Sequence, residues 1–173
     1  FFAERQAYLL ERRGFRYDEI RAVLPKDSSS LQPYTLLRRV HALAQARKAP
    51  GFEGLAGLFK RVKNITKDVA ATPASAEGLE ALRATLKEPA EHALLDELMR
   101  QGHGLEVALR VERLLEAMTQ LAHLHAPVDR FFVDVLVMAE DPALRAARLS
   151  LLGTLRSTIE MTGGDISEIA PEA

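Results

Sequence analysis

Apolar residues that repeat every three or four positions, in runs interrupted by proline and glycine, constrain the fold of this chain most. One run carries Leu36, Leu37, Val40, Leu43 and Ala44, a spacing that places them on one face of a helix. Proline and glycine separate such runs, and no segment alternates apolar and polar residues as a half-buried strand does. The 173 residues therefore predict an all-α bundle of roughly seven to nine helices.

The same pattern predicts how the chain is organised. We expect a helical domain over residues 1–162 and a flexible tail over residues 163–173, because two consecutive glycines end the last helical pattern. The glycines at 102 and 104 predict a turn between two helices, and Pro127 predicts a helix break. Since the chain starts on Phe1 rather than on methionine, we expect a fragment of a longer chain.

Composition excludes several classes of site. Apolar residues make up 47% and charged residues 27%, the balance of a globular domain with a sizeable core. Cysteine is absent, which excludes a disulfide scaffold, thiol catalysis and any cysteine-ligated metal. No apolar run reaches the roughly 18 residues of a membrane span. We therefore expect no membrane contact, and a reducing, cytoplasmic location.

No group of side chains forms a recognisable catalytic or metal-binding motif. His123 and His125 lie two positions apart, so a helix points them to different faces. Asp134 lies in an apolar segment, and we interpret it as the structural ion-pair partner of Arg145 or Arg148. We expect no catalytic residue, no metal site and no cofactor in this chain.

Positive charge concentrates in the first part of the chain. Residues 1–68 carry 14 Lys and Arg against 7 Asp and Glu, a net charge of +7. The remaining residues, 69–173, carry 9 against 17, a net charge of −8. This asymmetry is typical of a chain that binds a polyanion such as RNA, and it is equally consistent with solvated helix faces that differ in charge.

Two basic clusters are the candidate RNA contacts. The turn cluster surrounds Gly14 and consists of Arg12, Arg13, Arg16 and Tyr17. Arginines neutralise phosphates, and a tyrosine ring stacks on an unpaired base. The helix cluster lies on a predicted helix over residues 52–69 and consists of Lys60, Arg61, Lys63, Asn64 and Lys67. Its three lysines share one helix face.

Short segments occur in a fixed order along the chain. They read ERRGFRYDEI at residues 11–20, FKRVKNI at 59–65, EPAE at 88–91, PVDRFF at 127–132 and VLVMAED at 135–141. Together they resemble the C-terminal region of bacterial glycyl-tRNA synthetase β subunits. Residues 141–145 read DPALR, which is similar to the D-x-A-L-R string of the helical anticodon-binding domain of arginyl-tRNA synthetases.

This resemblance implies an anticodon-binding-domain-like bundle that holds glycine-accepting tRNA while glycylation takes place elsewhere in the enzyme. It implies the rest of the β subunit and the α subunit as partners, and ATP and magnesium as requirements of the whole enzyme. It implies no DNA binding. Under this interpretation the nine residues of the two clusters are the predicted RNA contacts.

A different class of function remains open from the residues alone. A helical protein–protein or subunit-interaction module without direct RNA contact has the same periodicity. In that case the apolar stripe around Phe131 and Phe132 is expected to be partly exposed and to dock another chain.

Overall fold

The computed structural model describes residues 2–25, 32–70, 75–110 and 113–171. The described elements are, in chain order, α1 (Phe2–Glu11), α2 (Tyr17–Val23), α3 (Pro33–Ala46), α4 (Phe52–Ile65), α5 (Ala76–Arg83), α6 (Pro89–Arg110), α7 (Leu114–Gln120), the 3₁₀ helix η2 (Leu121–Leu124), α8 (His125–Asp134), α9 (Pro142–Gly163) and the 3₁₀ helix η3 (Ile166–Glu168). Every described element is helical, which confirms the predicted all-α bundle.

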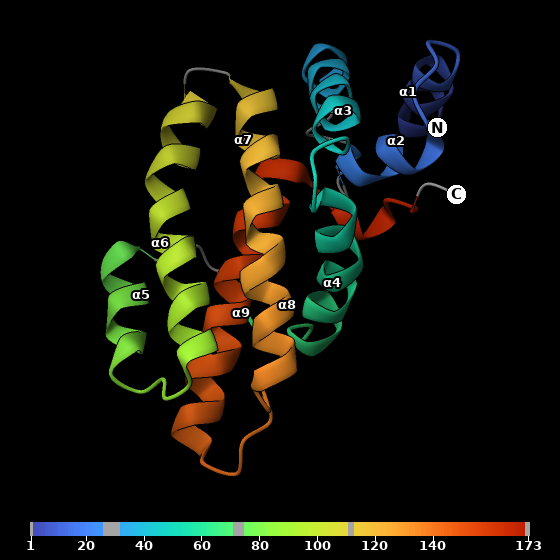
Figure 1. The fold of residues 1–173 in the computed structure, drawn as a ribbon. Coiled ribbons are helices and arrows are strands. Elements are labelled where there is room, and N and C mark those ends of the chain that lie inside the picture. The colour runs from blue at the N-terminus through green and yellow to red at the C-terminus, as the bar shows by residue number, and fades with distance from the viewer. Residues whose placement is uncertain (1, 26–31, 71–74, 111–112, 172–173) are drawn as a thin grey trace.

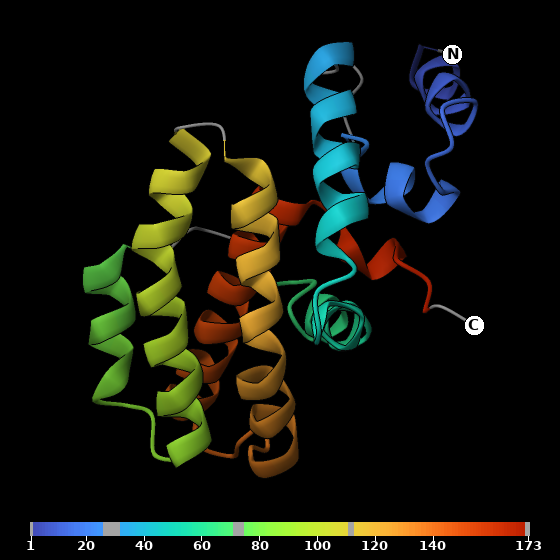
Figure 2. The ribbon, with the colours of Figure 1, turned by 45° about the horizontal axis from the view of Figure 1, so that its top comes forward.

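The long helices form an upright bundle, and the N-terminal helices pack on its side. Helices α7, η2 and α8 follow one another as a nearly continuous rod beside α6, with α9 behind them and α5 on the outer side of α6 (Figures 1 and 2). Helix α3 packs on α7, and α4 packs on α8 and α9. Helices α1 and α2 lie beyond α3, so the predicted turn cluster lies away from the α5–α6 side (Figure 1).

Tertiary packing overrides two predicted helix breaks. Helix α6 continues through Gly102, where we expected a turn. A glycine costs about 1 kcal/mol in a helix interior, which the burial of neighbouring residues such as Leu94 and Leu98 outweighs. Pro127 lies in the first turn of α8, where its missing N–H removes no helical hydrogen bond, and the preceding η2 marks the change of helix.

Aromatic and aliphatic side chains from most helices form one core. The predicted stripe residues Leu36, Val40 and Leu43 are buried, as expected. Phe131 and Phe132 are also buried, with their rings edge to face at a centroid distance of 5.7 Å. The pair itself is therefore not an exposed docking surface, because α8 packs it against α4 and α6, although Val133, Leu136 and Met138 in the following residues are exposed.

A buried ion pair joins the start of α6 to α9. The carboxylate of Glu91 binds the guanidinium of Arg148, and both side chains are almost completely buried. Glu91 also accepts hydrogen bonds from the backbone N–H groups of Lys87 (2.6 Å) and Glu88 (2.7 Å). Arg148 donates to the Leu136 carbonyl at 2.8 Å, so the pair also holds the α8–α9 loop.

The predicted partner of Asp134 is wrong. Asp134 pairs with Arg130, one turn earlier on α8, at the surface. Arg148 forms its ion pair with Glu91, and Arg145 donates a hydrogen bond to the carbonyl of Ala139 at 3.2 Å. The carboxylate stays near the surface, so it needs no partner from α9.

The segment after Gly163 packs against the domain, whereas the sequence predicts a flexible tail. Ile166 is fully buried, and η3 packs against α2 and α4. The Asp165 N–H donates to the Ala22 carbonyl at 2.7 Å. Gly164 has a φ of +79°, and a Cβ there would lie 2.2 Å from the Ala22 carbonyl oxygen, so only glycine permits this approach.

The Glu91–Arg148 pair predicts a large and specific loss of stability. Arg148→Ala leaves the Glu91 carboxylate buried and unpaired, which is expected to cost about 3–5 kcal/mol, or roughly 10 °C in Tm. Arg130→Ala removes a surface pair and is expected to change Tm little. Thermal unfolding followed by circular dichroism compares the two variants. Equal Tm shifts in both variants would contradict the structural role of the buried pair.

The same pair predicts a dependence of stability on pH. Burial raises the pKa of Glu91, but the hydrogen bonds from Glu88 and Lys87 and the Arg148 guanidinium outweigh it, so the folded-state pKa lies below the ordinary value of 4.5. A lowered folded-state pKa contributes stability above pH 4.5 that is lost as the pH falls through the folded value.

Urea unfolding between pH 6 and pH 3 measures this contribution as the difference in free energy of unfolding between the wild type and Glu91→Gln. We expect the difference to be largest above about pH 4.5 and to shrink as the pH falls further. A difference that is constant over the whole range would show that the pKa of Glu91 is the same in the folded and unfolded states, which would contradict the lowered folded-state pKa.

Candidate nucleic-acid interface

The turn cluster is built on a tight reversal between α1 and α2. Gly14 has a φ of +90°, and its N–H donates to the Glu11 carbonyl at 2.9 Å, which ends α1. Phe15 then packs against the core, while Arg12 and Arg13 point to solvent on the preceding turn. The reversal therefore displays two guanidinium groups side by side in sequence at an exposed corner.

Arg16 and Tyr17 are exposed but make contacts of their own. The Arg16 guanidinium binds the Asp18 carboxylate at 3.2 Å. Tyr17 is 60% exposed, and the Arg21 guanidinium carbon lies 5.7 Å from its ring centroid. Arg21 also donates to the Tyr17 hydroxyl at 3.3 Å. One face of the Tyr17 ring is therefore engaged by a cation–π contact within the protein.

A buried arginine fixes this corner to the rest of the molecule. The Arg47 side chain is 2% exposed, and it contacts Glu19 (3.1 Å), Glu53 (3.1 Å) and Asp18 (3.3 Å). Burial raises the pKa of Asp18. The N–H of Ala170 and the Arg16 and Arg47 guanidinium groups lower it by more than burial raises it, so the net shift of the pKa is downward. The first turn of α2 is thereby held against α3, α4 and the C-terminal segment.

The helix cluster divides into two kinds of residue. Lys60, Arg61, Asn64 and Lys67 are exposed. The Lys63 ammonium instead binds the Asp165 carboxylate and donates to the Ser167 hydroxyl at 3.0 Å. Burial raises the pKa of Asp165, and the hydrogen bonds from Lys63 and Ser167 outweigh it, so the carboxylate stays ionised.

Arg61 has a structural contact as well as an exposed position. Its guanidinium carbon lies 4.2 Å from the centroid of the Phe132 ring. At this distance the cation–π contact ties α4 to α8. The sequence did not indicate the Lys63–Asp165 pair or the Arg61–Phe132 contact, because in each case the two residues lie far apart in the chain.

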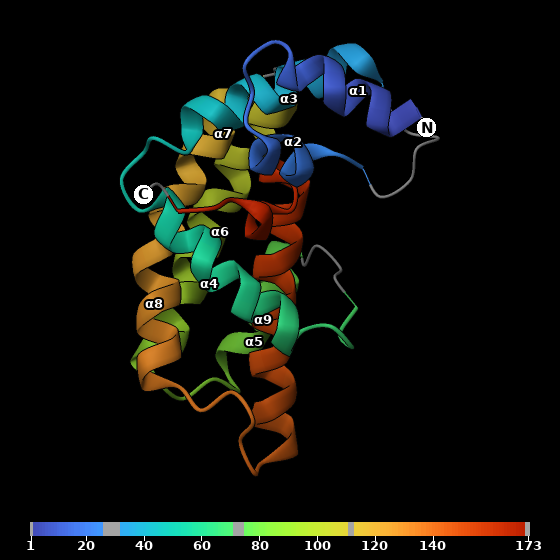
Figure 3. The same ribbon diagram turned by 90° about the vertical axis from the view of Figure 1, so that its right-hand side faces the viewer.

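The structure does not bring the two clusters together. The α1–α2 turn lies at one end of the molecule, and the C-terminal part of α4 lies well below it (Figure 3). A ligand that contacts both clusters must therefore extend along the side of the molecule.

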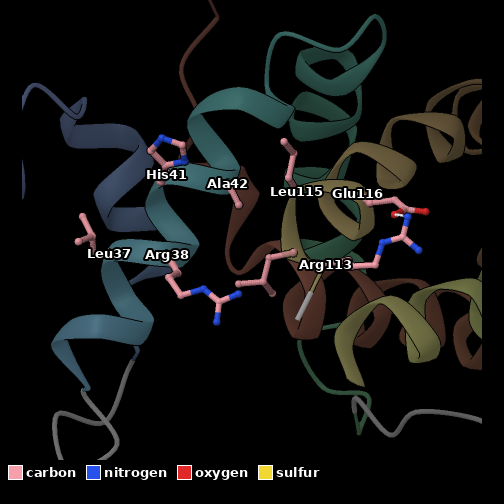
Figure 4. Close-up of a pocket in the computed structure, with 8 residues that line it drawn as sticks. Leu37, Arg38, His41, Ala42, Arg113, Leu115 and Glu116 are labelled. Atoms are coloured by element: carbon pink, nitrogen blue, oxygen red, sulfur yellow. Dashed lines mark ion pairs between the residues drawn. The ribbon is translucent and has the colours of Figure 1, made fainter. Parts of the chain in front are cut away.

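A groove between α3 and α7 contains charged residues outside both predicted clusters. It has a volume of about 670 Å³, and its lining includes Arg38 on α3 and Arg113 at the start of α7, whose guanidinium turns toward Glu116 (Figure 4). Tyr34 lies one turn before Arg38 and is 72% exposed. A tyrosine and an arginine at i and i+4 share a helix face, which was the sequence signal for this site.

Two further observations limit the chemistry. Among the described residues, no three histidine, aspartate or glutamate side chains are grouped so that they could bind a metal ion. Within the described part of the chain, no helix has both the length and the apolar character needed to cross a membrane.

Comparison with known proteins agrees with the resemblance predicted from the motifs. The chain is 33% identical to the glycine–tRNA ligase beta subunit of Moorella thermoacetica over 99% of this chain and 23% of that protein. It is 37% identical to the Dechloromonas aromatica subunit over 98% of this chain and 23% of that protein. It is 40% identical to the Vibrio cholerae subunit over 83% of this chain and 20% of that protein.

The chain thus spans about a fifth to a quarter of the length of the curated relatives it matches. Residues 58–166 match the family pattern of the DALR anticodon binding domain. That match extends from α4 to η3 and includes the DPALR string that begins at Asp141. Because it covers more than half of the 173 residues, the chain belongs to the DALR anticodon-binding domain family.

Proposed function

We propose that this chain is the tRNA-binding, anticodon-recognising part of a glycine–tRNA ligase β subunit. The match of residues 58–166 to an anticodon-binding domain carries this proposal. The relatives named as glycine–tRNA ligase beta subunits support the choice of glycine-accepting tRNA. The chain supplies binding energy and placement, and the bond-forming steps belong to other parts of the enzyme.

The two clusters have different roles in this proposal. Arg12 and Arg13 bind phosphates at the α1–α2 corner, with Arg16 beside them and Tyr17 offering the ring face that Arg21 leaves open. Phosphate contacts fix the position of an RNA, whereas contacts with unstacked bases specify its sequence.

The helix cluster follows the RNA backbone away from the corner. Lys60, Arg61 and Lys67 are exposed and provide the charge, and the exposed Asn64 amide offers hydrogen bonds beside them. Lys63 contributes mainly by holding the C-terminal segment through Asp165. The distance between the clusters suits a long ligand such as the arm of a tRNA rather than a small molecule (Figure 3).

The same proposal defines the partners of the chain. They are glycine-accepting tRNA, the rest of the β subunit and the α subunit, in the cytoplasm. The whole enzyme uses ATP and magnesium, and this chain holds no cofactor of its own. Phe131 and Phe132 are buried and are not available to dock another chain, and the family match favours the RNA-binding role over a purely protein-binding one.

Binding of tRNA at low and high salt tests the proposal. We expect glycine tRNA to bind the chain, with affinity falling about threefold per neutralised phosphate between 50 and 200 mM salt. Replacing the anticodon is expected to weaken binding by roughly fivefold or more, because each specific base contact is lost. Fluorescence anisotropy with labelled tRNA measures both effects. Absence of binding at low salt, or binding blind to the anticodon, contradicts anticodon recognition.

Charge-removing variants test the assignment of residues. Arg12→Ala and Arg13→Ala are each expected to weaken binding to all tRNAs alike and to reduce the slope of log affinity against log salt by about one. Lys67→Ala is expected to act in the same way without a change in Tm. Lys63→Ala is expected to lower Tm as well, since it releases Asp165. Arg100→Ala, an exposed arginine on α6, is the matched control.

An unchanged salt slope in Arg12→Ala, Arg13→Ala and Lys67→Ala would show that other cations contact the RNA. If Arg100→Ala weakened tRNA binding as much as these variants, the affinity would depend only on the net charge of the chain and not on the positions of these residues.

A further inference from the structure

The α3–α7 groove has an apolar floor and an arginine on its α3 side. Its apolar lining residues are Leu37, Ala42, Leu114 and Leu115. Arg38 extends from α3 toward α7, whereas the Arg113 guanidinium on the α7 side turns away from Arg38 and pairs with Glu116 (Figure 4). A concave surface of about 670 Å³ with apolar walls and a few polar groups is typical of a site that holds a flat ring.

An exposed aromatic ring stands beside the groove. Tyr34 is 72% exposed, one helical turn before Arg38. The Arg38 guanidinium carbon lies 5.8 Å from the centroid of the Tyr34 ring. Tyrosine rings and guanidinium planes are the two surfaces on which proteins stack unpaired bases of RNA. This pair therefore extends the apolar floor with two stacking surfaces.

The charge of the groove favours an anionic ligand. Among the described residues that line it, Glu116 is the one carboxylate, and it is paired with Arg113. Arg38 adds a positive charge that lies directly over the apolar floor. An apolar segment of protein would gain nothing from these cations, whereas a nucleotide presents both a ring and a phosphate.

His41 on α3 links the groove to the segment that follows the Gly14 reversal. His41 lines the groove, and its ring meets the ring of Phe15 edge to face at a centroid distance of 6.3 Å. Phe15 follows the Gly14 reversal, so the exposed Arg12 and Arg13 lie on the segment that contacts α3. An RNA strand whose phosphates reach the turn cluster thereby reaches the groove with a neighbouring nucleotide.

We propose that the α3–α7 groove holds one unstacked nucleobase of the bound RNA. Leu114 and Leu115 pack on the base, Arg38 and Tyr34 stack on it, and the turn cluster binds the phosphates of the adjoining nucleotides. This inference rests on the proposed function and adds to it a specific base-binding place. Half of the residues lining that place come from α3, which lies outside the matched family region of residues 58–166.

The test compares the full chain with three groove variants, Tyr34→Ala, Arg38→Ala and Leu115→Ser. The probes are the anticodon stem-loop of glycine tRNA and a set of the same RNAs in which each loop nucleotide in turn lacks its base. We expect each groove variant to bind the intact RNA about tenfold more weakly, since stacking on one base accounts for an effect of this size. One of the abasic RNAs, the one that lacks the base held in the groove, is expected to bind the wild-type chain about as weakly as the intact RNA binds the groove variants.

The decisive measurement combines a groove substitution in the protein with the loss of one base in the RNA. For that one abasic RNA, the groove variants are expected to cause no further loss, because the base they would contact is already missing. Arg12→Ala is expected to weaken all the RNAs alike. The matched control is Leu136→Ser, which alters an exposed apolar residue in the α8–α9 loop and is expected to bind as wild type. Circular dichroism confirms that every variant keeps its helix content.

The outcomes separate this inference from the proposed function. If Arg12→Ala weakens binding and the groove variants do not, the chain is an RNA-binding domain and the groove inference is wrong. If the groove variants weaken binding to every abasic RNA equally, they act through charge or folding, and the base-binding role is also wrong. If the chain binds none of the RNAs at low salt, both proposals fail.

Discussion

The buried guanidinium of Arg47 holds together the part of the molecule that displays the turn cluster. A cation almost excluded from water is stable only when carboxylates and carbonyl groups replace its hydration. Glu19 and Asp18 from α2, Glu53 from α4 and the Ala170 carbonyl (2.9 Å) provide this replacement. Because these groups come from segments far apart in the chain, their meeting fixes the α1–α2 corner relative to α3 and α4.

A second ionic contact plays the same part at the other side of the bundle. Glu91 and Arg148 connect the start of α6 to α9, and Arg148 also holds the Leu136 carbonyl of the α8–α9 loop. The core between these two contacts is apolar and supplies most of the stabilisation through burial. The polar contacts decide which helix ends meet, and the core decides that the helices pack at all.

This arrangement leaves the cations that face solvent on rigid supports. Arg12 and Arg13 follow a helix end fixed by Gly14, and Lys60 and Arg61 stand on a helix whose opposite side is buried. Arg38 and Tyr34 stand on α3, which packs firmly on α7. Side chains on rigid helices lose less conformational freedom when they bind, so a modest number of contacts suffices to orient a large RNA.

Some predictions that rested on local rules were confirmed, whereas the turn predicted at Gly102 was not. The spacing of Leu36, Val40 and Leu43 predicted the buried face of α3. Asp141, which directly precedes Pro142, caps α9 through the N–H groups of Ala143 and Leu144. The motifs identified the family, because their order and residue types are specific. The predicted RNA contacts remain a prediction, since residue type and helix geometry alone support them.

The sequence by itself determined the helical class, the core faces and the family. These follow from periodicity, capping and motif, which depend on residues a few positions apart. Only the tertiary structure decided that Lys63 holds Asp165, that Asp134 pairs within α8, that the last residues pack through Ile166, and that Arg38 and Arg113 flank one groove. Each of these contacts depends on how separate helices pack. The free energy of packing comes from the whole core, so no single segment of the sequence determines it.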